Sequence, residues 1–281
     1  LARTLNKKIP DDVQVYGLIT DACIELGKYE EAEKAAQWML DLRPGNVAGL
    51  TRGAYLRELF GDLDGAIDFM RQAHSRIRPE EYEDRAWVLT HLGHLQLMKG
   101  DAASAERVLS NALSLFPDYH YALAKLGKVR QAQNKHAEAV ELFRKRYAIA
   151  AHPENLYDVA VALHKAGQLD EARKTFAEFE VSARKEMEGV DNANRELMFY
   201  YLEYGNRAAE ALRIAELEMK RRQDVHTREA YAWALHRSGK HKEAAEQIRK
   251  ALSIGVKEPE MLGRASVIEQ SLKTSDQVAT R

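Results

Sequence analysis

Apolar residues recur three and four positions apart along most of this sequence, a spacing that places them on one face of an α-helix. Tyr16, Ile19 and Cys23 form one such face. A turn at Gly27 separates it from a second face that begins at Ala32. The strict alternation of half-buried strands and the long Val/Ile runs of parallel sheets do not occur in the sequence. The pattern therefore predicts an all-α protein built from pairs of amphipathic helices joined by short turns.

The helix pairs repeat. A turn residue followed five positions later by alanine recurs about every 34 residues. The pairs are Gly27 and Ala32, Gly61 and Ala66, Gly100 and Ala105, Asn134 and Ala139, Gly167 and Ala172, and Gly239 and Ala244. In one further unit, the step from Gly205 to Ala211 is one residue longer. Prolines fall at unit junctions, where they cost no internal helix hydrogen bond, namely at Pro10, Pro44, Pro79, Pro117 and Pro153.

Several residues within each unit repeat together. The first unit has Tyr16, Gly27, Tyr29, Ala32 and Pro44; the third has Leu92, Gly93, Gly100, Ala105, Ala112 and Pro117; the fourth has Leu126, Gly127, Ala139 and Phe143. This pattern resembles that of the tetratricopeptide repeat (TPR) family. The resemblance implies a right-handed α-solenoid superhelix of stacked antiparallel helix pairs.

The repeat period sets the expected domain organisation. Residues 13–258 are predicted to form one solenoid of seven TPR-like helix pairs. Residues 1–12 are interpreted as the second helix of an upstream repeat, 259–273 as a C-terminal capping helix and 274–281 as a tail. The alanines after each turn are expected at tight helix crossings, because a larger side chain there introduces strain of about 1–3 kcal/mol.

The resemblance also implies a site, because the first helices of TPR units line the inner, concave wall. Aromatic residues and arginine at such positions are frequent anchors of protein interfaces. We therefore expect a peptide-binding groove lined by Tyr55, Trp87, His94, Tyr121, Lys128, Gln131, Tyr157, Asn192, Arg195, Phe199, Trp233, His236 and Arg237. A shift of one position in the alignment would move the aromatic residues into the core, so core packing stays open as the alternative for each of them.

Composition narrows the classes of partner. The 281 residues carry 42 Lys and Arg against 43 Asp and Glu, a formal net charge of -1. This balance, with Glu58, Glu196 and Glu229 on or beside the inner wall, argues against a nucleic-acid-binding array, which needs a basic surface. No apolar run approaches the roughly 20 residues of a membrane span. The single cysteine, Cys23, excludes a disulfide within the chain and is expected to pack in the core.

The sequence contains no motif that predicts catalysis: it has no phosphate-binding loop, no nucleophile elbow and no His-Glu-x-x-His pair. His91 and His94 have a spacing that can bind metal, but further ligands at suitable spacing are missing. We therefore expect a non-catalytic protein-interaction scaffold with no cofactor and a protein or peptide partner.

Three alternatives stay open at this point: an RNA-binding helical array, an interaction module of a larger enzyme, and self-association through the end units. The compartment also stays open. The cytoplasm is slightly favoured, and a periplasmic location fits if a targeting signal precedes Leu1.

Overall fold

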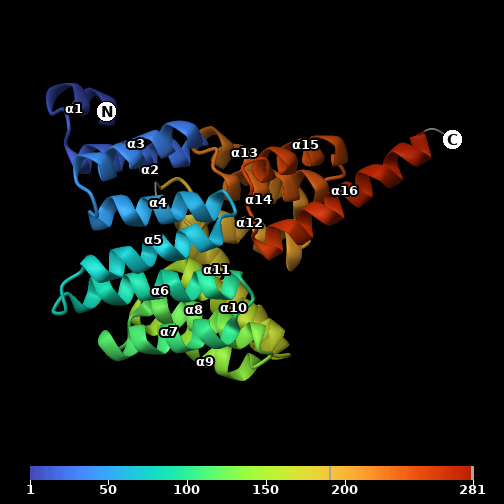
Figure 1. Ribbon diagram of the computed structural model, residues 1–281. Coiled ribbons are helices and arrows are strands. Elements are labelled where there is room, and N and C mark those ends of the chain that lie inside the picture. The colour runs from blue at the N-terminus through green and yellow to red at the C-terminus, as the bar shows by residue number, and fades with distance from the viewer. Residues whose placement is uncertain (190, 280–281) are drawn as a thin grey trace. The chain divides into compact units, whose positions relative to one another are not determined.

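The computed structural model describes the backbone of residues 1–189 and 191–279, and within it all regular secondary structure is helical (Figure 1). This confirms the predicted all-α solenoid architecture. The chain divides into two compact units. Unit 2 is the continuous segment Ile67–Glu196, whereas unit 1 combines Leu1–Ala66 with the chain from Leu197 onward. The prediction of one continuous solenoid did not anticipate that unit 1 would draw on both ends of the chain.

Unit 2 consists mainly of three consecutive helix pairs. They are α6 (Tyr82–Met98) with α7 (Ala102–Leu115), α8 (His120–Ala132) with α9 (His136–Ile149), and α10 (Pro153–Lys165) with α11 (Leu169–Glu186). Neighbouring pairs are joined by packing of α7 on α8 and of α9 on α10, and α6 also packs on α8. Helices α8 and α10 therefore each lie between their own second helix and the preceding pair, as in a stacked array.

Unit 1 contains helices from both ends of the chain. Its N-terminal part has α1 (Ala2–Lys8), α2 (Val13–Glu25), α3 (Tyr29–Leu42) and α4 (Val47–Leu59). Its C-terminal part has α13 (Ala208–Arg221), α14 (Val225–Arg237), α15 (His241–Leu252) and α16 (Pro259–Ala279). Helices α5 (Leu63–Arg76) and α12 (Asn194–Glu203) cross the boundaries between the units.

Helix α16 occupies the place predicted for a capping helix and packs on α14 and α15. It continues to Ala279, past the boundary at residue 273 that the sequence predicts. Thr280 and Arg281, also part of the predicted tail, lie outside the described residues.

The turns follow the predicted repeat, with one informative shift. The turn residues Gly27, Gly61, Gly100, Asn134, Gly167 and Gly239 all have positive φ angles. In the remaining unit the positive φ falls on Asn206, at 49°, and not on Gly205. Counting from Asn206 restores the five-residue spacing to Ala211, so the apparently irregular unit keeps the regular turn. Asparagine is one of the few residues other than glycine that enters this region readily.

Side-chain caps define where several helices begin. Asp12, Asp101 and Asp224 each accept a hydrogen bond from a backbone amide two or three residues further on, at 2.8, 2.9 and 2.9 Å. Such caps satisfy amide groups that have no partner inside the helix, and losing one costs about 1 kcal/mol. The three aspartates thereby help to set the register of the first residues of α2, α7 and α14.

The small residues of the repeat lie where helices cross closely, as predicted. Ala32, Ala66, Ala105, Ala139, Ala172, Ala211 and Ala244 are all buried, and Cys23 is buried as well. A Cβ at Gly127 would stand 2.7 Å from Cζ of Phe143 on the paired helix. This separation is too short for a carbon–carbon contact, so the crossing of α8 and α9 requires glycine at that position.

Candidate functional site

The first helix of unit 2, α6, presents Trp87 and His94 two turns apart. Both side chains are half-buried. The Trp87 ring packs against His91, with centroids 4.1 Å apart. His94 Nδ1 lies 3.4 Å from Nζ of Lys125 on α8, so the imidazole nitrogen can accept a hydrogen bond from the ammonium group. Packing of α6 on α8 thus brings the side chains of His94 and Lys125 together.

Helix α8 carries the most exposed aromatic residue of the predicted set. Tyr121 is 50% exposed, and its ring stacks on that of His120 at a centroid distance of 3.8 Å. Two turns further on, Lys128 and Gln131 lie on the same helix and are half-buried. Lys128 Nζ also lies 5.5 Å from the centroid of the Phe143 ring. An exposed ring and two hydrogen-bond donors therefore share one helix.

Helix α10 contributes Tyr157, which is more involved in packing than its sequence position suggested. The ring is half-buried and lies 5.3 Å from Phe179 and 6.0 Å from Phe176, both on the paired helix α11. For Tyr157, the core-packing alternative accounts for most of the ring contacts.

Sequence reasoning missed the charged group at the centre of this wall. The carboxylate of Asp158 accepts hydrogen bonds from Lys128 Nζ at 3.2 Å and from Arg146 Nη1 at 2.5 Å. Asp158 comes from α10, Lys128 from α8 and Arg146 from α9. Asp158 follows Tyr157 directly, but Arg146 belongs to a second helix, and the repeat pattern gives no signal that it reaches this carboxylate.

Asn192 lies just before α12 and Arg195 lies in its first turn, and local contacts occupy Asn192. Asn192 Nδ2 donates to the carbonyl oxygen of Gly189 at 2.8 Å, and its Oδ1 accepts from the amide of Asn194 at 3.1 Å. Arg195 is half-buried beside Glu196. Burial raises the pKa of Glu196 above its ordinary value, and the positive charge of Arg195 opposes that rise. Asn192 therefore shapes the loop, and of the two Arg195 is the better candidate for a ligand contact.

In unit 1, the C-terminal helix covers Phe199 of α12 and Glu229 of α14. Phe199 is only 4% exposed, because the Arg264 guanidinium of α16 lies over its ring at 4.3 Å from the centroid. Arg264 Nη1 donates to Glu229 at 2.5 Å, and Nη2 lies 3.4 Å from Glu203. The expectation that Phe199 faces an accessible groove is therefore corrected: the ring packs against Arg264.

Helix α14 ends with a cluster of Trp233, His236 and Arg237. The Trp233 and His236 rings are stacked at 5.0 Å with an angle of 18° between their planes, and the Arg237 guanidinium lies 5.9 Å from the Trp233 centroid. His236 Nδ1 lies 3.3 Å from Nδ1 of His241. Burial lowers the pKa of His236, and His241 and Arg237 lower it further. Arg237 is exposed, whereas Trp233 and His236 are half-buried.

Tyr55 on α4 is the remaining residue predicted for the groove. It is half-buried and packs against an apolar cluster that contains residues from both chain segments of unit 1. Burial raises the pKa of its hydroxyl above the ordinary value, and the nearby carboxylates of Glu58 and Asp224 add to the effect. Tyr55 therefore lies at a contact within the chain.

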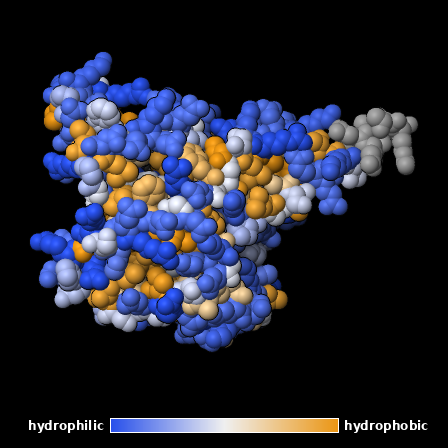
Figure 2. Space-filling view, in the orientation of Figure 1, coloured by the Kyte–Doolittle hydropathy of each residue, from blue (hydrophilic) through white to orange (hydrophobic). Residues whose placement is uncertain are grey.

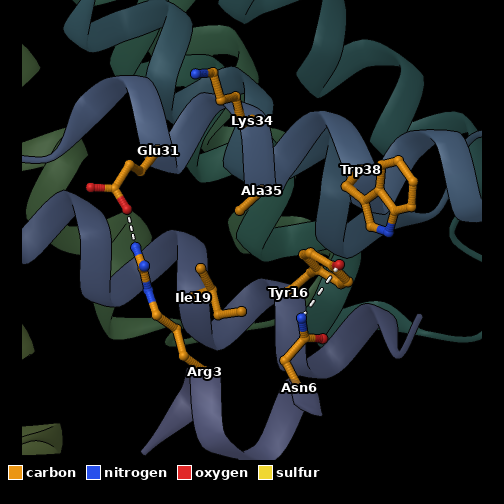
Figure 3. Close-up of a pocket in the computed structure, with 8 residues that line it drawn as sticks. All are labelled: Arg3, Asn6, Tyr16, Ile19, Glu31, Lys34, Ala35 and Trp38. Atoms are coloured by element: carbon orange, nitrogen blue, oxygen red, sulfur yellow. Dashed lines mark hydrogen bonds and ion pairs between the residues drawn. The ribbon is translucent and has the colours of Figure 1, made fainter. Parts of the chain in front are cut away.

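The clearest hollow in unit 1 lies among α1, α2 and α3 (Figure 3). It has a volume of about 440 Å³ and is lined by Arg3, Asn6, Tyr16, Ile19, Glu31, Lys34, Ala35 and Trp38. Arg3 pairs with Glu31 across its mouth, and Asn6 Nδ2 lies 3.5 Å from the Tyr16 hydroxyl. The sequence did not single out this hollow, because its walls come from three helices and include α1, outside the predicted array.

Metal sites and membrane-spanning helices are two further features that the described residues could form. Among the described side chains there is no group of three or more His, Cys, Asp or Glu residues arranged to hold a metal ion. None of the described helices combines the length and apolar character that crossing a bilayer requires.

Comparisons with known proteins agree with the fold. A family model described as tetratricopeptide repeat matches residues 21–81, 91–155 and 125–185, and a second model of the same description matches residues 225–250. The search of curated protein sequences gave no significant match. The helix pairs, turns and buried alanines described above are those expected for such repeats.

Solved structures show the same architecture. The human IFIT1 dimer with PPP-AAAA aligns at a TM-score of 0.59 and 12% identity, covering 90% of this chain and 66% of that chain. The APC/C hetero-tetramer Cut9-Hcn1 aligns at 0.54 and 14%, covering 95% and 44%. A tetratricopeptide repeat protein from Parabacteroides merdae ATCC 43184 aligns at 0.52 and 16%, covering 92% and 98%. At these identities the likeness establishes the fold, and with the family matches it shows that this chain belongs to the tetratricopeptide repeat family.

Proposed function

We propose that this protein is a non-catalytic scaffold that holds a peptide segment of a protein partner against the inner wall of unit 2, formed by α6, α8 and α10. Tetratricopeptide repeats are typically non-catalytic protein-interaction scaffolds. The observation that supports the choice of unit 2 is Tyr121, which is 50% exposed on α8; α8 also carries Lys128 and packs on α6, which carries Trp87. In unit 1, the predicted groove residue Phe199 is only 4% exposed and is covered by Arg264.

The chemistry of this wall suits a peptide. Trp87 and Tyr121 offer apolar ring surface with little rotamer entropy to lose, which is why such residues anchor interfaces. Lys128 offers an ammonium donor to peptide carbonyl oxygens, which are the most frequent acceptors along any peptide, whereas Nε2 of Gln131 is buried. Asp158 holds Lys128 in place, so part of the entropy cost of fixing that long side chain is already met before binding.

The test first selects a peptide ligand from a pool of random sequences. A displayed library of random peptides is panned on the folded chain, and a synthetic copy of the enriched peptide is measured by isothermal titration calorimetry. Tyr121→Ala and Trp87→Ala should each weaken binding by about 2 kcal/mol, roughly thirtyfold in Kd.

Two control variants locate the site. Tyr82→Ala removes an equally exposed ring at the start of α6, and Trp233→Ala alters unit 1 only. Both should leave Kd within about twofold of the unaltered protein, a change of under about 0.5 kcal/mol. An unchanged Kd for both Tyr121→Ala and Trp87→Ala would rule out the wall of unit 2 as the binding surface. A loss with Trp233→Ala alone would place the peptide on unit 1.

A further inference from the structure

The two chain segments of unit 1 meet where turns of the N-terminal repeats contact loops of the C-terminal repeats (Figure 1). We call this contact the clasp. Its residues are Glu25, Gly27, Tyr29, Phe60 and Gly61 on one side, and Arg222–Val225 and Gly255–Lys257 on the other. The array thus makes a contact far beyond the neighbouring repeat.

Two hydrogen bonds of the clasp involve backbone amides just before α14. The amide of Gln223 donates to the carbonyl oxygen of Glu25 at 2.7 Å. The amide of Val225 donates to the hydroxyl of Tyr29 at 2.9 Å, across 196 residues of sequence. Val225 is only 3% exposed, and leaving its amide buried without an acceptor costs about 1–3 kcal/mol. The N-terminal repeats therefore supply acceptors that the start of α14 needs.

Backbone also approaches backbone in the clasp. A Cβ at Gly61 would stand 2.2 Å from the carbonyl oxygen of Gly255, and one at Gly27 would stand 2.7 Å from that of Gln223. Gly100 and Gly167 occupy the same turn position with the same left-handed φ, yet nothing lies within 4 Å of their Cβ positions. The repeat turn alone requires positive φ, whereas the clasp additionally requires that Gly27 and Gly61 have no side chain.

Apolar side chains continue the contact. One buried cluster includes Ile24 and Leu59 from the N-terminal segment together with Val225 and Val256 from the C-terminal segment. Tyr55, which the family pattern places on the inner wall, packs against this same cluster. Figure 2 shows apolar side chains gathered on this face over α14–α16, next to charged ones. The closed clasp therefore keeps Tyr55 from a ligand.

The hydrogen bonds and the close backbone approaches of the clasp are made at helix ends, turns and loops, while α2 packs on α3 and α14 packs on α15 within their own segments. One pair of like charges faces across the clasp. Burial raises the pKa of Glu25, and the negative charge of Asp224 from the other segment raises it further. Arg222, whose Nη1 is 3.8 Å from Glu25 Oε2, and His226 act in the opposite direction.

We propose that the clasp is a conformational switch within unit 1, whose closed form covers Tyr55 and whose open form exposes it while the helix pairs on both sides stay folded. The proposal does not depend on which wall binds a peptide, because it concerns contacts inside the chain. Opening breaks the hydrogen bonds of the Gln223 and Val225 amides and separates apolar residues of one shared cluster, and it relieves the repulsion between Glu25 and Asp224.

The experiment uses the full chain and matched glycine substitutions. Gly27→Ala and Gly61→Ala add a methyl group inside the clasp, whereas Gly100→Ala and Gly167→Ala add it at the same backbone conformation in open space. Hydrogen exchange is followed residue by residue at the Gln223 and Val225 amides. Both clasp variants should exchange these amides at least about tenfold faster than the two control variants. Amides in the middle of α3 and α15 should keep their rates.

The outcomes separate the proposal from its alternatives. Equal exchange rates in clasp and control variants would show that the close approach does not hold the two segments together. Acceleration that spreads through α15 would show that the contact is inseparable from the core, and either result overturns the switch. If the alanine variants do not fold, Tyr29→Phe replaces them. It keeps the ring but removes the acceptor of the Val225 amide, and it must accelerate exchange at Val225 for the proposal to stand.

Discussion

Unit 1 and unit 2 are built from the same repeat but neutralise the charges of their inner walls differently. In unit 2, the carboxylate of Asp158 is shared by Lys128 and Arg146, both from neighbouring repeats. In unit 1, the carboxylate of Glu229 is buried to 1% exposure and is met by Arg264 of the C-terminal helix. A carboxylate of the inner wall is therefore paired by the preceding repeat, α8 and α9, in unit 2, and by the C-terminal helix in unit 1. Whether a repeat can bind a ligand on its inner wall therefore depends on which other parts of the chain pack against that wall.

The two units also differ in the range of their contacts. The helices of unit 2 pack on sequence neighbours, so its stability should approximate a sum over adjacent pairs. Unit 1 adds the clasp between segments far apart in the sequence. A substitution in unit 2 should therefore destabilise mainly the neighbouring helix pairs. A substitution in unit 1 can destabilise helices from both ends of the chain.

The largest effect is expected from the buried charge pair of unit 1. Arg264→Met keeps an unbranched stem over Phe199 but leaves the Glu229 carboxylate buried without its partner. Removing one member of a buried pair costs about 3–5 kcal/mol. Urea unfolding followed by circular dichroism measures this loss.

Arg237→Met provides the matched control for that experiment, because Arg237 is an exposed arginine on the neighbouring helix α14. It should change the free energy of unfolding by less than about 0.5 kcal/mol. Adding Glu229→Leu to Arg264→Met should recover much of the loss, because the double variant also removes the buried carboxylate. Similar losses for Arg264→Met and Arg237→Met would show that the buried pair of Arg264 and Glu229 contributes no more to stability than an exposed arginine does.

A smaller effect is expected at a helix crossing of unit 2. Ala105 is completely buried between α7 and α6, and Ala105→Leu should destabilise the fold by about 1–3 kcal/mol through overpacking. Ala103→Leu, on the exposed side of the same helix, is the control and should change stability by less than about 0.5 kcal/mol. Thermal melts of both variants measure the difference, and equal melting temperatures would argue against a tight crossing.

The smallest effect concerns an exposed charge pair of unit 2. Hydrogen bonds from Arg130 and Gln133 hold the pKa of Glu106 at about 2. Because this pKa is below its ordinary value of 4.5, the stabilising contribution is present above about pH 4.5 and is lost as the pH falls toward 2. A surface pair of this kind contributes under about 1 kcal/mol.

The urea midpoint at pH 6 and at pH 3 tests this expectation. Glu106→Gln keeps a hydrogen-bonding side chain of similar size but cannot titrate. The variant should therefore lose less stability between the two pH values than the unaltered chain does. A fall of the same size in both proteins would assign the pH dependence to other groups.

Much of the fold was predictable from local rules. Each turn needs a residue that tolerates positive φ, and each close crossing needs a small side chain, so glycine and alanine mark both in the sequence. The one misplaced turn shows the limit of these rules. Gly205 and Asn206 both tolerate the left-handed region, and the hydrogen bonds of Gly205 and Arg207 to the end of α12 place the turn on Asn206.

The candidate site was predictable only in part. The repeat period correctly assigns Trp87, Tyr121 and Lys128 to the first helices of successive pairs, because the period fixes which helix a residue belongs to. It does not identify Arg146 or Arg264, since both reach the inner walls from helices that the family pattern does not assign to them.

The amino-acid sequence alone was sufficient for the helix pairs, their turns and their order, because each depends on residues fewer than about 40 positions apart. Which residues of the inner walls a ligand can reach was decided only by the tertiary structure. A ring that faces solvent and a ring that faces a distant repeat have the same local periodicity. Phe199 is covered from α16, and Tyr55 is covered at the clasp. Burial of this kind is decided by long-range packing, which a local pattern of apolar residues does not record.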